Sequence, residues 1–487
     1  MRERSAVVGG VLAKRTVSSG LPRGWLFFET LLTLLFGSSW LTASAEELKA
    51  GAARVEITPP VGHQLWGLAS RVGPSTGVLD PLYAQVLVLK STRSSLALVT
   101  LDLGRTFDVQ NMADLRARVK LEFGIQHVIF SASHTHTGPT VLDKKYILPG
   151  SNRWEPQALD SIAHAIGEAS LKAVPCYIGA GKGTSSVGQN RQDPVGGLWT
   201  NEIRHPNYPR DPVVQVLRVS EIGGKAIAVV ANYAAHPVVL DSGNSTEYSA
   251  DFPGAMARYV EENLTGAICL FVQGACGDIN SRYLGQYPST ERGPGYYGVL
   301  VHEMRQLGRE LGYEVLRVAN GIQLTRPQHA ELLVQDDELT FKARWDIAKL
   351  KALQAVPTYH QWAVEGRPVG YPPEQFTVFI TSALIDRHIA LLTMPGEPYV
   401  EHQISFRDRL PGLDTILAGY ANGYLGYIPT IRVAARDGVV YGGNAWPTIL
   451  EVGAGERIVD RGIINMYRML GRLKDKPDQD ARAAGNQ

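Results

Sequence analysis

Short apolar runs alternate with amphipathic stretches along most of the chain. The apolar runs are rich in β-branched residues and bounded by polar or turn residues, as is typical of strands. They cover residues 96–103, 127–133, 213–219, 226–233, 267–272 and 389–394. The amphipathic stretches predict helices over residues 109–123, 157–172, 253–263 and 297–312. Because strands alternate with helices, the pattern predicts an α/β protein with mixed β-sheets flanked by helices.

The same pattern bears on domain organisation. No linker rich in Ser, Pro or Gly divides the chain, and no internal repeat is visible. We therefore predict one large domain from about residue 46 to about residue 474, followed by a polar tail over residues 475–487, and leave open a lobe over residues 324–377. Three irregular stretches, 143–154, 284–297 and 420–446, interrupt the pattern. Long loops inside a compact domain are usually functional.

The first 45 residues have the features of an export signal. Five basic residues precede an apolar run over residues 25–41, and Ala43-Ser44-Ala45 supplies the small-x-small pattern that a signal peptidase reads. We therefore predict a signal peptide over residues 1–45 and a secreted or periplasmic protein. An uncleaved anchor helix is the alternative, although the 17-residue run contains Glu29 and a spanning helix needs about 20 apolar residues.

Composition and charge narrow the function classes. The chain has 487 residues with 44% hydrophobic side chains, enough for a large core. A formal net charge of +1 gives no electrostatic reason to bind nucleic acid, so a small or neutral partner is expected. Three cysteines without a CxxC pair exclude a disulfide framework and a structural cysteine–zinc site.

The segment Ser133-His134-Thr135-His136-Thr137-Gly138-Pro139 carries the strongest local signal for chemistry. It follows a predicted strand, where residues i and i+2 face the same way, so both imidazoles are expected to point into one cleft. Two convergent imidazoles suit a metal or a proton-transfer site. Histidines that are satisfied by local hydrogen bonds are the alternative.

Two more candidates follow predicted strands. His236 comes after the strand at 226–233, and Glu397 comes after the strand at 389–394. The carboxyl ends of strands are where α/β proteins assemble their sites. Two histidines and one carboxylate make a catalytic zinc set with a position left for water or substrate. A buried structural histidine and a solvated loop carboxylate remain the alternatives.

Motifs for other chemistries are missing from the sequence. It contains neither G-x-S-x-G nor H-E-x-x-H, and the glycine-rich segment 179–183 fits neither a dinucleotide fingerprint nor a P-loop. Serine-hydrolase and nucleotide-binding functions are therefore disfavoured. A zinc ion held from separate strands, rather than from one helix, fits the sequence better.

Seven motifs occur in the order found in the neutral/alkaline non-lysosomal ceramidases. They are residues 51–62, 133–139, 190–191, 235–237, 273–280, 395–397 and 422–428. The chain thus resembles the catalytic domain of this family over most of its length. The immunoglobulin-like C-terminal domain of ceramidases is not expected, because no residues remain for it.

The resemblance implies a set of site residues. It implies Zn2+ bound by His134, His236, Glu397 and Tyr427. It also implies His136 and Arg191 beside the scissile amide, where they would stabilise the developing oxyanion, and Tyr441 as a further catalytic-site tyrosine. The function it implies is a secreted zinc-dependent amidohydrolase. The enzyme would hydrolyse the amide of N-acylsphingosine (ceramide) or a related lipid amide by attack of zinc-bound water.

Asn280 departs from the family pattern. It stands where the family motif Gly-Asp-Val-Ser-Pro-Asn has its serine, and Ser281 is one residue out of register, which reverses side-chain direction in extended backbone. As a catalytic candidate, Asn280 could still hydrogen-bond an amide. Two alternative functions follow: the same metal site acting on a different amide or ester, or a non-catalytic secreted binding protein of the same fold. Contact with a membrane would come through a lipid substrate, and the sequence does not indicate an oligomeric state.

Overall fold

A computed structural model describes residues 47–473 except 68–70, 72, 148–152, 192–207, 241–244, 283–294, 353–370 and 436–447. The predicted signal peptide, the polar tail and Tyr441 lie outside the described residues. The described residues belong to one unit that begins at Glu46. In this part of the chain, no helix has both the length and the apolar character needed to cross a membrane.

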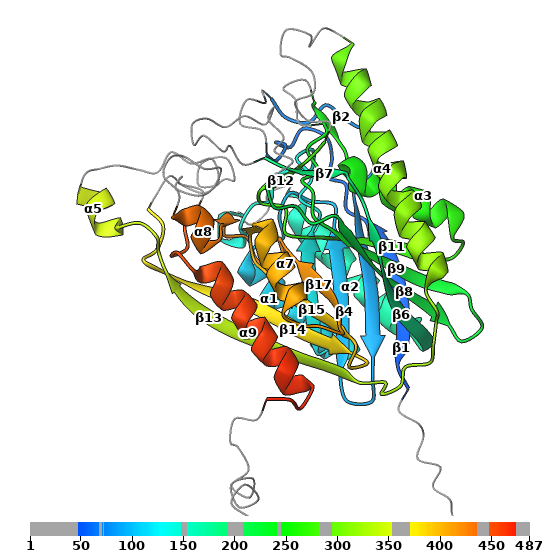
Figure 1. Ribbon diagram of the computed structural model, residues 1–487. Coiled ribbons are helices and arrows are strands. Elements are labelled where there is room, and N and C mark those ends of the chain that lie inside the picture. Colours follow the sequence, from blue (N-terminus) through cyan, green and yellow to red (C-terminus); the bar gives the residue numbers. More distant parts are fainter. Residues whose placement is uncertain are drawn as a thin grey trace, which may run out of the picture. The chain divides into compact units, whose positions relative to one another are not determined.

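The larger β-sheet has eight strands in the order β11-β9-β8-β6-β1-β3-β4-β5 (Figure 1). Its strands are β1 (Lys49–Glu56), β3 (Tyr83–Lys90), β4 (Ser95–Leu101), β5 (His127–Ala132), β6 (Val174–Thr184), β8 (Val213–Glu221), β9 (Ala226–Tyr233) and β11 (Ile268–Gln273). The β4–β5 and β9–β11 pairs are parallel, and the other neighbours are antiparallel. The sheet is therefore mixed, as the sequence predicts.

A second sheet has four strands in the order β13-β14-β15-β17. These strands are β13 (Leu332–Lys342), β14 (Gln375–Ile385), β15 (Ile389–Thr393) and β17 (Asp414–Ala418). Residues of both sheets, such as Val230 of β9 and Leu391 of β15, share one buried cluster. The two sheets therefore pack face to face. β13 pairs with β14 along its whole length, so this part of the region 324–377 belongs to the second sheet.

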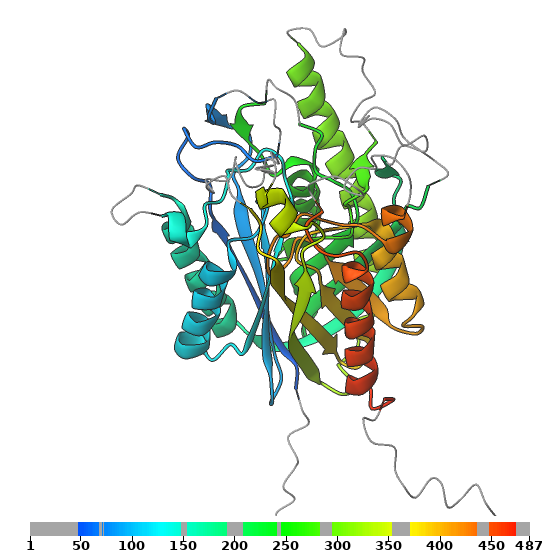
Figure 2. The ribbon, with the colours of Figure 1, turned by 90° about the vertical axis from the view of Figure 1, so that its left-hand side faces the viewer.

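Helices cover the outer faces of both sheets (Figures 1 and 2). They are α1 (Val109–Phe123), α2 (Glu155–Leu171), α3 (Asp251–Asn263), α4 (Tyr296–Gly321), α7 (Val400–Asp408) and α9 (Ala454–Met469). Two shorter helices, α5 (Ile347–Ala352) and α8 (Ile431–Ala434), lie outside these layers. Figure 2 shows α1 and α2 in cyan on one side of the paired sheets and α7 and α9 in orange and red on the other. Helices α3 and α4 pack beside α2 and α1 on the larger sheet, over β6, β8 and β11. The layers are helix, sheet, sheet and helix.

Short elements connect these layers at the carboxyl ends of the central strands. They are β2 (Gly77–Val78), the 3-10 helix η1 (Lys144–Tyr146), β7 (Gly188–Asn190), β10 (Glu247–Tyr248), β12 (Ile279–Ser281), β16 (Glu397–Pro398) and β18 (Tyr427–Ile428). β7 pairs with β12, and β16 pairs with β18. These two small ladders carry several of the candidate site residues. The three cysteines are buried free thiols.

Each predicted strand and helix is present, with most ends shifted by one or two residues. The exception is the predicted end of the helix at residue 312, which is wrong, because α4 continues to Gly321. Gly308 and Gly312 do not end the helix. They allow α3 to approach, since a Cβ at Gly308 would lie 2.4 Å from Ala255 Cβ. Close helix packing thus overrides the local tendency of glycine to terminate a helix.

Candidate metal centre

Chain segments from both sheets bring a group of imidazole and carboxyl side chains together. His134 and His136 follow β5, His236 follows β9, and Glu397 opens β16 just after β15. Backbone bonds fix these segments, because His134 N donates to Leu103 O and His236 N donates to Ile279 O, each at 2.9 Å. The site therefore lies at the carboxyl ends of the central strands, where α/β proteins commonly assemble their sites.

The spacing of the ring nitrogens fits a shared cation. His134 Nε2 lies 3.3 Å from His136 Nε2, and the ligand atoms of these rings and of His236 all lie within 4.8 Å of one another. Glu397 Oε2 is 3.2 Å from His236 Nε2 and 3.6 Å from His134 Nε2. Neighbouring ligands of a tetrahedral ion with bonds of about 2.0–2.1 Å are about 3.3 Å apart. The distances from Glu397 Oε2 to His236 Nε2 and His134 Nε2 are close to this separation, so these atoms could share one cation.

Hydrogen bonds orient two of the rings. His134 Nδ1 is 2.6 Å from Gly104 O, and His236 Nδ1 is 2.5 Å from Cys276 O. Each Nδ1 must carry the proton to donate to its carbonyl, which leaves Nε2 with a free lone pair. Burial lowers the pKa of His134 and of His236 well below the usual value, and the Arg191 charge lowers the latter further. Both rings are therefore neutral, the form that binds a metal.

The turn that carries His134 and His136 differs from the sequence prediction. β5 ends at Ala132, and His134 has φ 67°, in the left-handed region. The expectation that extended alternation aligns the two rings is wrong, and a turn makes them converge instead. The His134 ring stacks on Tyr420 with 4.1 Å between centroids, and Tyr420 also has a positive φ, of 52°. Non-glycine residues keep a left-handed backbone conformation only where the surrounding packing holds it, and such residues are frequent at functional sites.

Two tyrosines that the sequence did not single out hold Glu397. Tyr420 Oη donates to Glu397 Oε2 at 3.4 Å, and Tyr424 Oη donates to Oε1. Burial raises the pKa of Tyr420 well above its usual value, so this phenol keeps the proton that it donates. Both carboxylate oxygens are thereby oriented, which is the usual role of groups that support a metal ligand. The sequence pointed to this region only through the irregular stretch 420–446 and through the family motif 422–428, which contains Tyr424.

We expect Tyr424→Phe to weaken metal binding about tenfold, because loss of a hydrogen bond to a metal ligand typically costs 10- to 100-fold in affinity. Chelator competition on the purified protein measures this effect. Tyr467→Phe is the matched control, since its hydroxyl donates to Arg409 O at an exposed position away from Glu397. Equal metal affinity in both variants would show that the Tyr424 hydroxyl does not orient Glu397.

The structure brings Arg191, Asn280 and Tyr427 to the same cluster. Arg191 is buried, and its Nη2 lies 3.0 Å from Tyr427 Oη and 3.4 Å from His236 Nε2. Its Nη1 donates to Asn280 Oδ1 at 3.0 Å. Tyr427 pairs with Glu397 in the β16–β18 ladder. Of the residues predicted from the sequence, only Tyr441 lies outside the described part of the chain.

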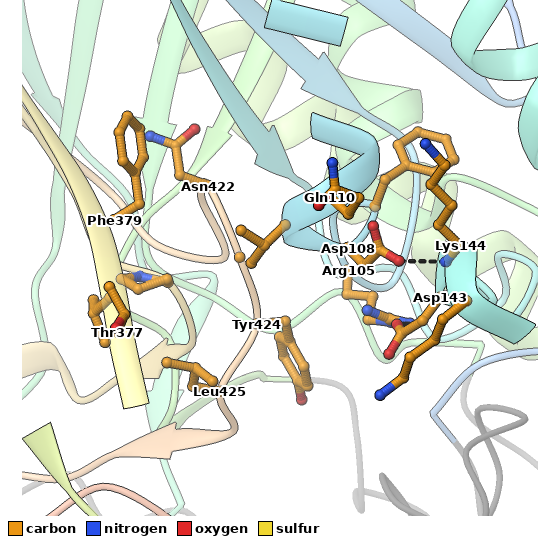
Figure 3. A pocket seen from close by; sticks show the side chains of 16 residues that line it. Arg105, Asp108, Gln110, Asp143, Lys144, Thr377, Phe379, Asn422, Tyr424 and Leu425 are labelled. Atoms are coloured by element: carbon orange, nitrogen blue, oxygen red, sulfur yellow. Dashed lines mark hydrogen bonds and ion pairs between the residues drawn. The ribbon is translucent and has the colours of Figure 1, made fainter. Parts of the chain in front are cut away.

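A pocket of about 650 Å³ has Tyr424 in its lining, whereas the candidate histidines and Glu397 are not among its lining residues (Figure 3). One wall carries apolar side chains such as Phe379 and Leu425, and another carries charged ones such as Asp108 and Lys144. Figure 3 shows Tyr424 between these walls. Since Tyr424 also hydrogen-bonds Glu397, a ligand in this pocket would touch the residue that orients the candidate metal ligand.

The fold and site define a mixed α/β protein with a buried histidine group that could bind a metal. A sequence model of the neutral/alkaline non-lysosomal ceramidases, N-terminal part, matches residues 48–293. The chain belongs to this family.

Two solved structures share the fold. One is a neutral ceramidase from Pseudomonas aeruginosa, with 18% identity and a TM-score of 0.67, covering 90% of this chain and 77% of that one. The other is described as a ceramidase complexed with C2, with 17% identity and a TM-score of 0.68, covering 89% and 76% of the two chains. At these identities the likeness concerns the fold alone.

Proposed function

We propose that this protein is a zinc-dependent amidohydrolase that cleaves the amide bond of ceramide or a related lipid amide. The observation that carries the proposal is the convergence of His134 Nε2, His236 Nε2 and Glu397 Oε2 at ligand spacing. Membership in the ceramidase family supports the reaction class. Nitrogen and carboxylate ligands together suit Zn2+, whereas Mg2+ and Ca2+ prefer oxygen ligands.

The proposed ligands are His134, His236, Glu397 and Tyr427. When bound, zinc supplies a Lewis acid that polarises a carbonyl and lowers the pKa of water towards about 7. His136 is the least buried of the three histidines, so we assign it to the substrate side of the cluster. Arg191 supplies a positive charge beside Tyr427 and His236, where it would stabilise the oxyanion that develops on the amide.

The ligand assignment predicts an order of metal affinity. We expect Glu397→Gln to weaken zinc binding more than Tyr427→Phe, because a neutral amide loses the anionic charge that holds a divalent cation, whereas a phenol contributes less charge. Chelator competition ranks the two variants. If Tyr427→Phe binds zinc more weakly than Glu397→Gln, the assigned roles are reversed.

Two features support a lipid amide as substrate. The pocket beside Tyr424 has an apolar wall, and one structural relative is described as complexed with C2. A different amide or ester at the same site is the second candidate, because Asn280 stands in place of the family serine. Incubation with short-chain ceramides, N-acyl amino acids and N-acetylated sugars, with products identified by mass, distinguishes the candidates. Release of sphingosine supports the proposal, and absence of any cleavage supports a binding protein.

We also propose export of the protein. Residues 1–45 would act as the signal peptide and residues 46–474 as the zinc hydrolase domain, placing the mature enzyme in the periplasm or outside the cell. N-terminal sequencing of the exported protein tests this proposal, with Glu46 expected as the first residue. A protein that keeps residues 1–45 would instead be anchored.

A further inference from the structure

Asn280 lies within the buried network around Arg191. It is the central residue of β12, opposite Gln189 of β7, and it forms a parallel bridge with His236. Its side chain is fully buried. The antiparallel β7–β12 ladder places Arg191, the residue after β7, beside β12, and Arg191 N donates to Asp278 O at 2.9 Å. The backbone thus sets the distance between the Asn280 amide and the Arg191 guanidinium.

The guanidinium is held at both of its terminal nitrogens, Nη1 and Nη2. Nη1 donates to Asn280 Oδ1 at 3.0 Å, and Nη2 donates to Gly277 O at 2.7 Å. Nη2 is also the atom that lies near Tyr427 and His236. Because a guanidinium is planar and rigid, fixing Nη1 fixes the direction in which Nη2 points. The Asn280 oxygen and the Gly277 carbonyl thus hold the two ends of the guanidinium that faces the candidate metal centre.

We propose that Asn280 is a positioning residue that acts through Arg191, and that its amide oxygen orients the guanidinium instead of contacting substrate. An amide oxygen is two bonds from Cβ and a serine hydroxyl only one, so a serine at this position would not span the same gap. This inference rests on the proposed function only for the effect that Asn280 has on catalysis. The contact itself joins two side chains of this protein, so it can be measured without metal or substrate.

The first test measures unfolding of the metal-free protein. Asn280→Ala, Arg191→Ala and the double variant form a double-mutant cycle, read by denaturant unfolding. Hydrogen bonds to charged groups are among the stronger ones, so we expect the cycle to show a coupling of at least about tenfold in the unfolding equilibrium constant. Additive effects of the two substitutions would overturn the proposed contact. This readout does not depend on zinc or on any substrate.

The second test separates orientation from substrate contact. Asn280→Asp keeps the Oδ1 acceptor, loses the Nδ2 donor and adds a negative charge that offsets part of the Arg191 charge, so we expect it to recover part of the kcat that Asn280→Ala loses, with KM little changed. A contact between Nδ2 and substrate predicts instead that Asn280→Asp is as impaired as Asn280→Ala. Asn280→Ser should behave like Asn280→Ala. Faster ceramide hydrolysis by Asn280→Ser would overturn the inference.

The two tests fail independently. If the wild-type protein cleaves no amide, the proposed function fails while the unfolding cycle still decides whether Asn280 holds Arg191. If the wild type cleaves ceramide and the cycle shows no coupling, the proposed function stands and the inference fails.

Discussion

Replacing His236 with alanine should remove the metal and reduce amide hydrolysis by at least about a thousandfold, because a catalytic zinc supplies several kcal/mol of transition-state stabilisation. His236 provides one of the converging Nε2 atoms, and its Nδ1 contact with Cys276 O leaves it pre-oriented for binding. Elemental analysis after dialysis should find about one zinc per chain in the wild type and almost none in the variant.

A matched histidine on the surface controls for general effects of the substitution. His164 lies on α2 and is largely exposed, beside Asp160. We expect His164→Ala to keep both the metal and the activity. Equal zinc content in the wild type and in His236→Ala would exclude His236 as a ligand. Loss of zinc without loss of hydrolysis would exclude metal from the reaction.

Arg191→Ala should lower kcat about 100- to 1000-fold while the protein keeps its zinc, because loss of one group that stabilises an oxyanion has effects of this size. The guanidinium is adjacent to Tyr427 and His236, yet it carries a positive charge and cannot itself bind a cation. Removing it should therefore separate catalysis from metal binding. Steady-state kinetics and elemental analysis on one preparation measure both quantities.

Two further variants sharpen this experiment. Arg191→Lys keeps the charge but cannot reproduce the planar two-nitrogen contact with Asn280 and Tyr427, so its kcat should lie between those of the wild type and Arg191→Ala. Arg218→Ala is the control, since Arg218 Nη1 donates to the Ala319 carbonyl of helix α4 and not to a candidate site residue. Unchanged kcat in Arg191→Ala would contradict the oxyanion role, and loss of zinc would assign Arg191 to the structure of the metal centre.

The strands that the sequence predicted are mostly buried on both faces, although β3 and β17 are buried as well and were not predicted. All eight residues of β9 are buried, and so are all five of β15. Such strands appear in a sequence as continuous apolar runs, because neither face meets water. β13 escaped prediction, since several of its central residues are charged or polar and it lies at the edge of its sheet. Charged residues on edge strands protect against pairing with other chains. They also interrupt the apolar run by which a strand is recognised in a sequence.

The glycine-rich segment 179–183 also belongs to a strand that was not predicted. It lies within β6, where helix α4 crosses closely. A Cβ at Gly179 would lie 2.5 Å from Ile322 Cγ2, and one at Gly183 would lie 2.2 Å from Glu314 Oε1. Glycine at these positions makes room for the helix. The glycines of this segment are therefore explained by close packing against α4 and the residue that follows it, a contact that a single sequence does not reveal.

The candidate site was only partly visible in the sequence. His134, His236 and Glu397 stood out because each follows an apolar strand, and the structure brings them together. Arg191 and Tyr427 were indicated by the family resemblance alone. The role of Tyr424 could not be predicted although the residue lies in the motif 422–428, since its hydroxyl reaches Glu397 only through the path of the chain after β17, where Asn422 has φ 59°. A contact that depends on such a turn leaves no periodic pattern.

The most direct test of zinc-dependent amide hydrolysis is a zinc titration of the metal-free protein. Zinc is added in known amounts, and sphingosine released from a short-chain ceramide is quantified by mass. We predict that hydrolysis rises in proportion to added zinc and reaches its plateau at about one ion per chain, and that His236→Ala stays inactive throughout. Full hydrolysis by the metal-free protein, or none at any zinc concentration, would contradict this account.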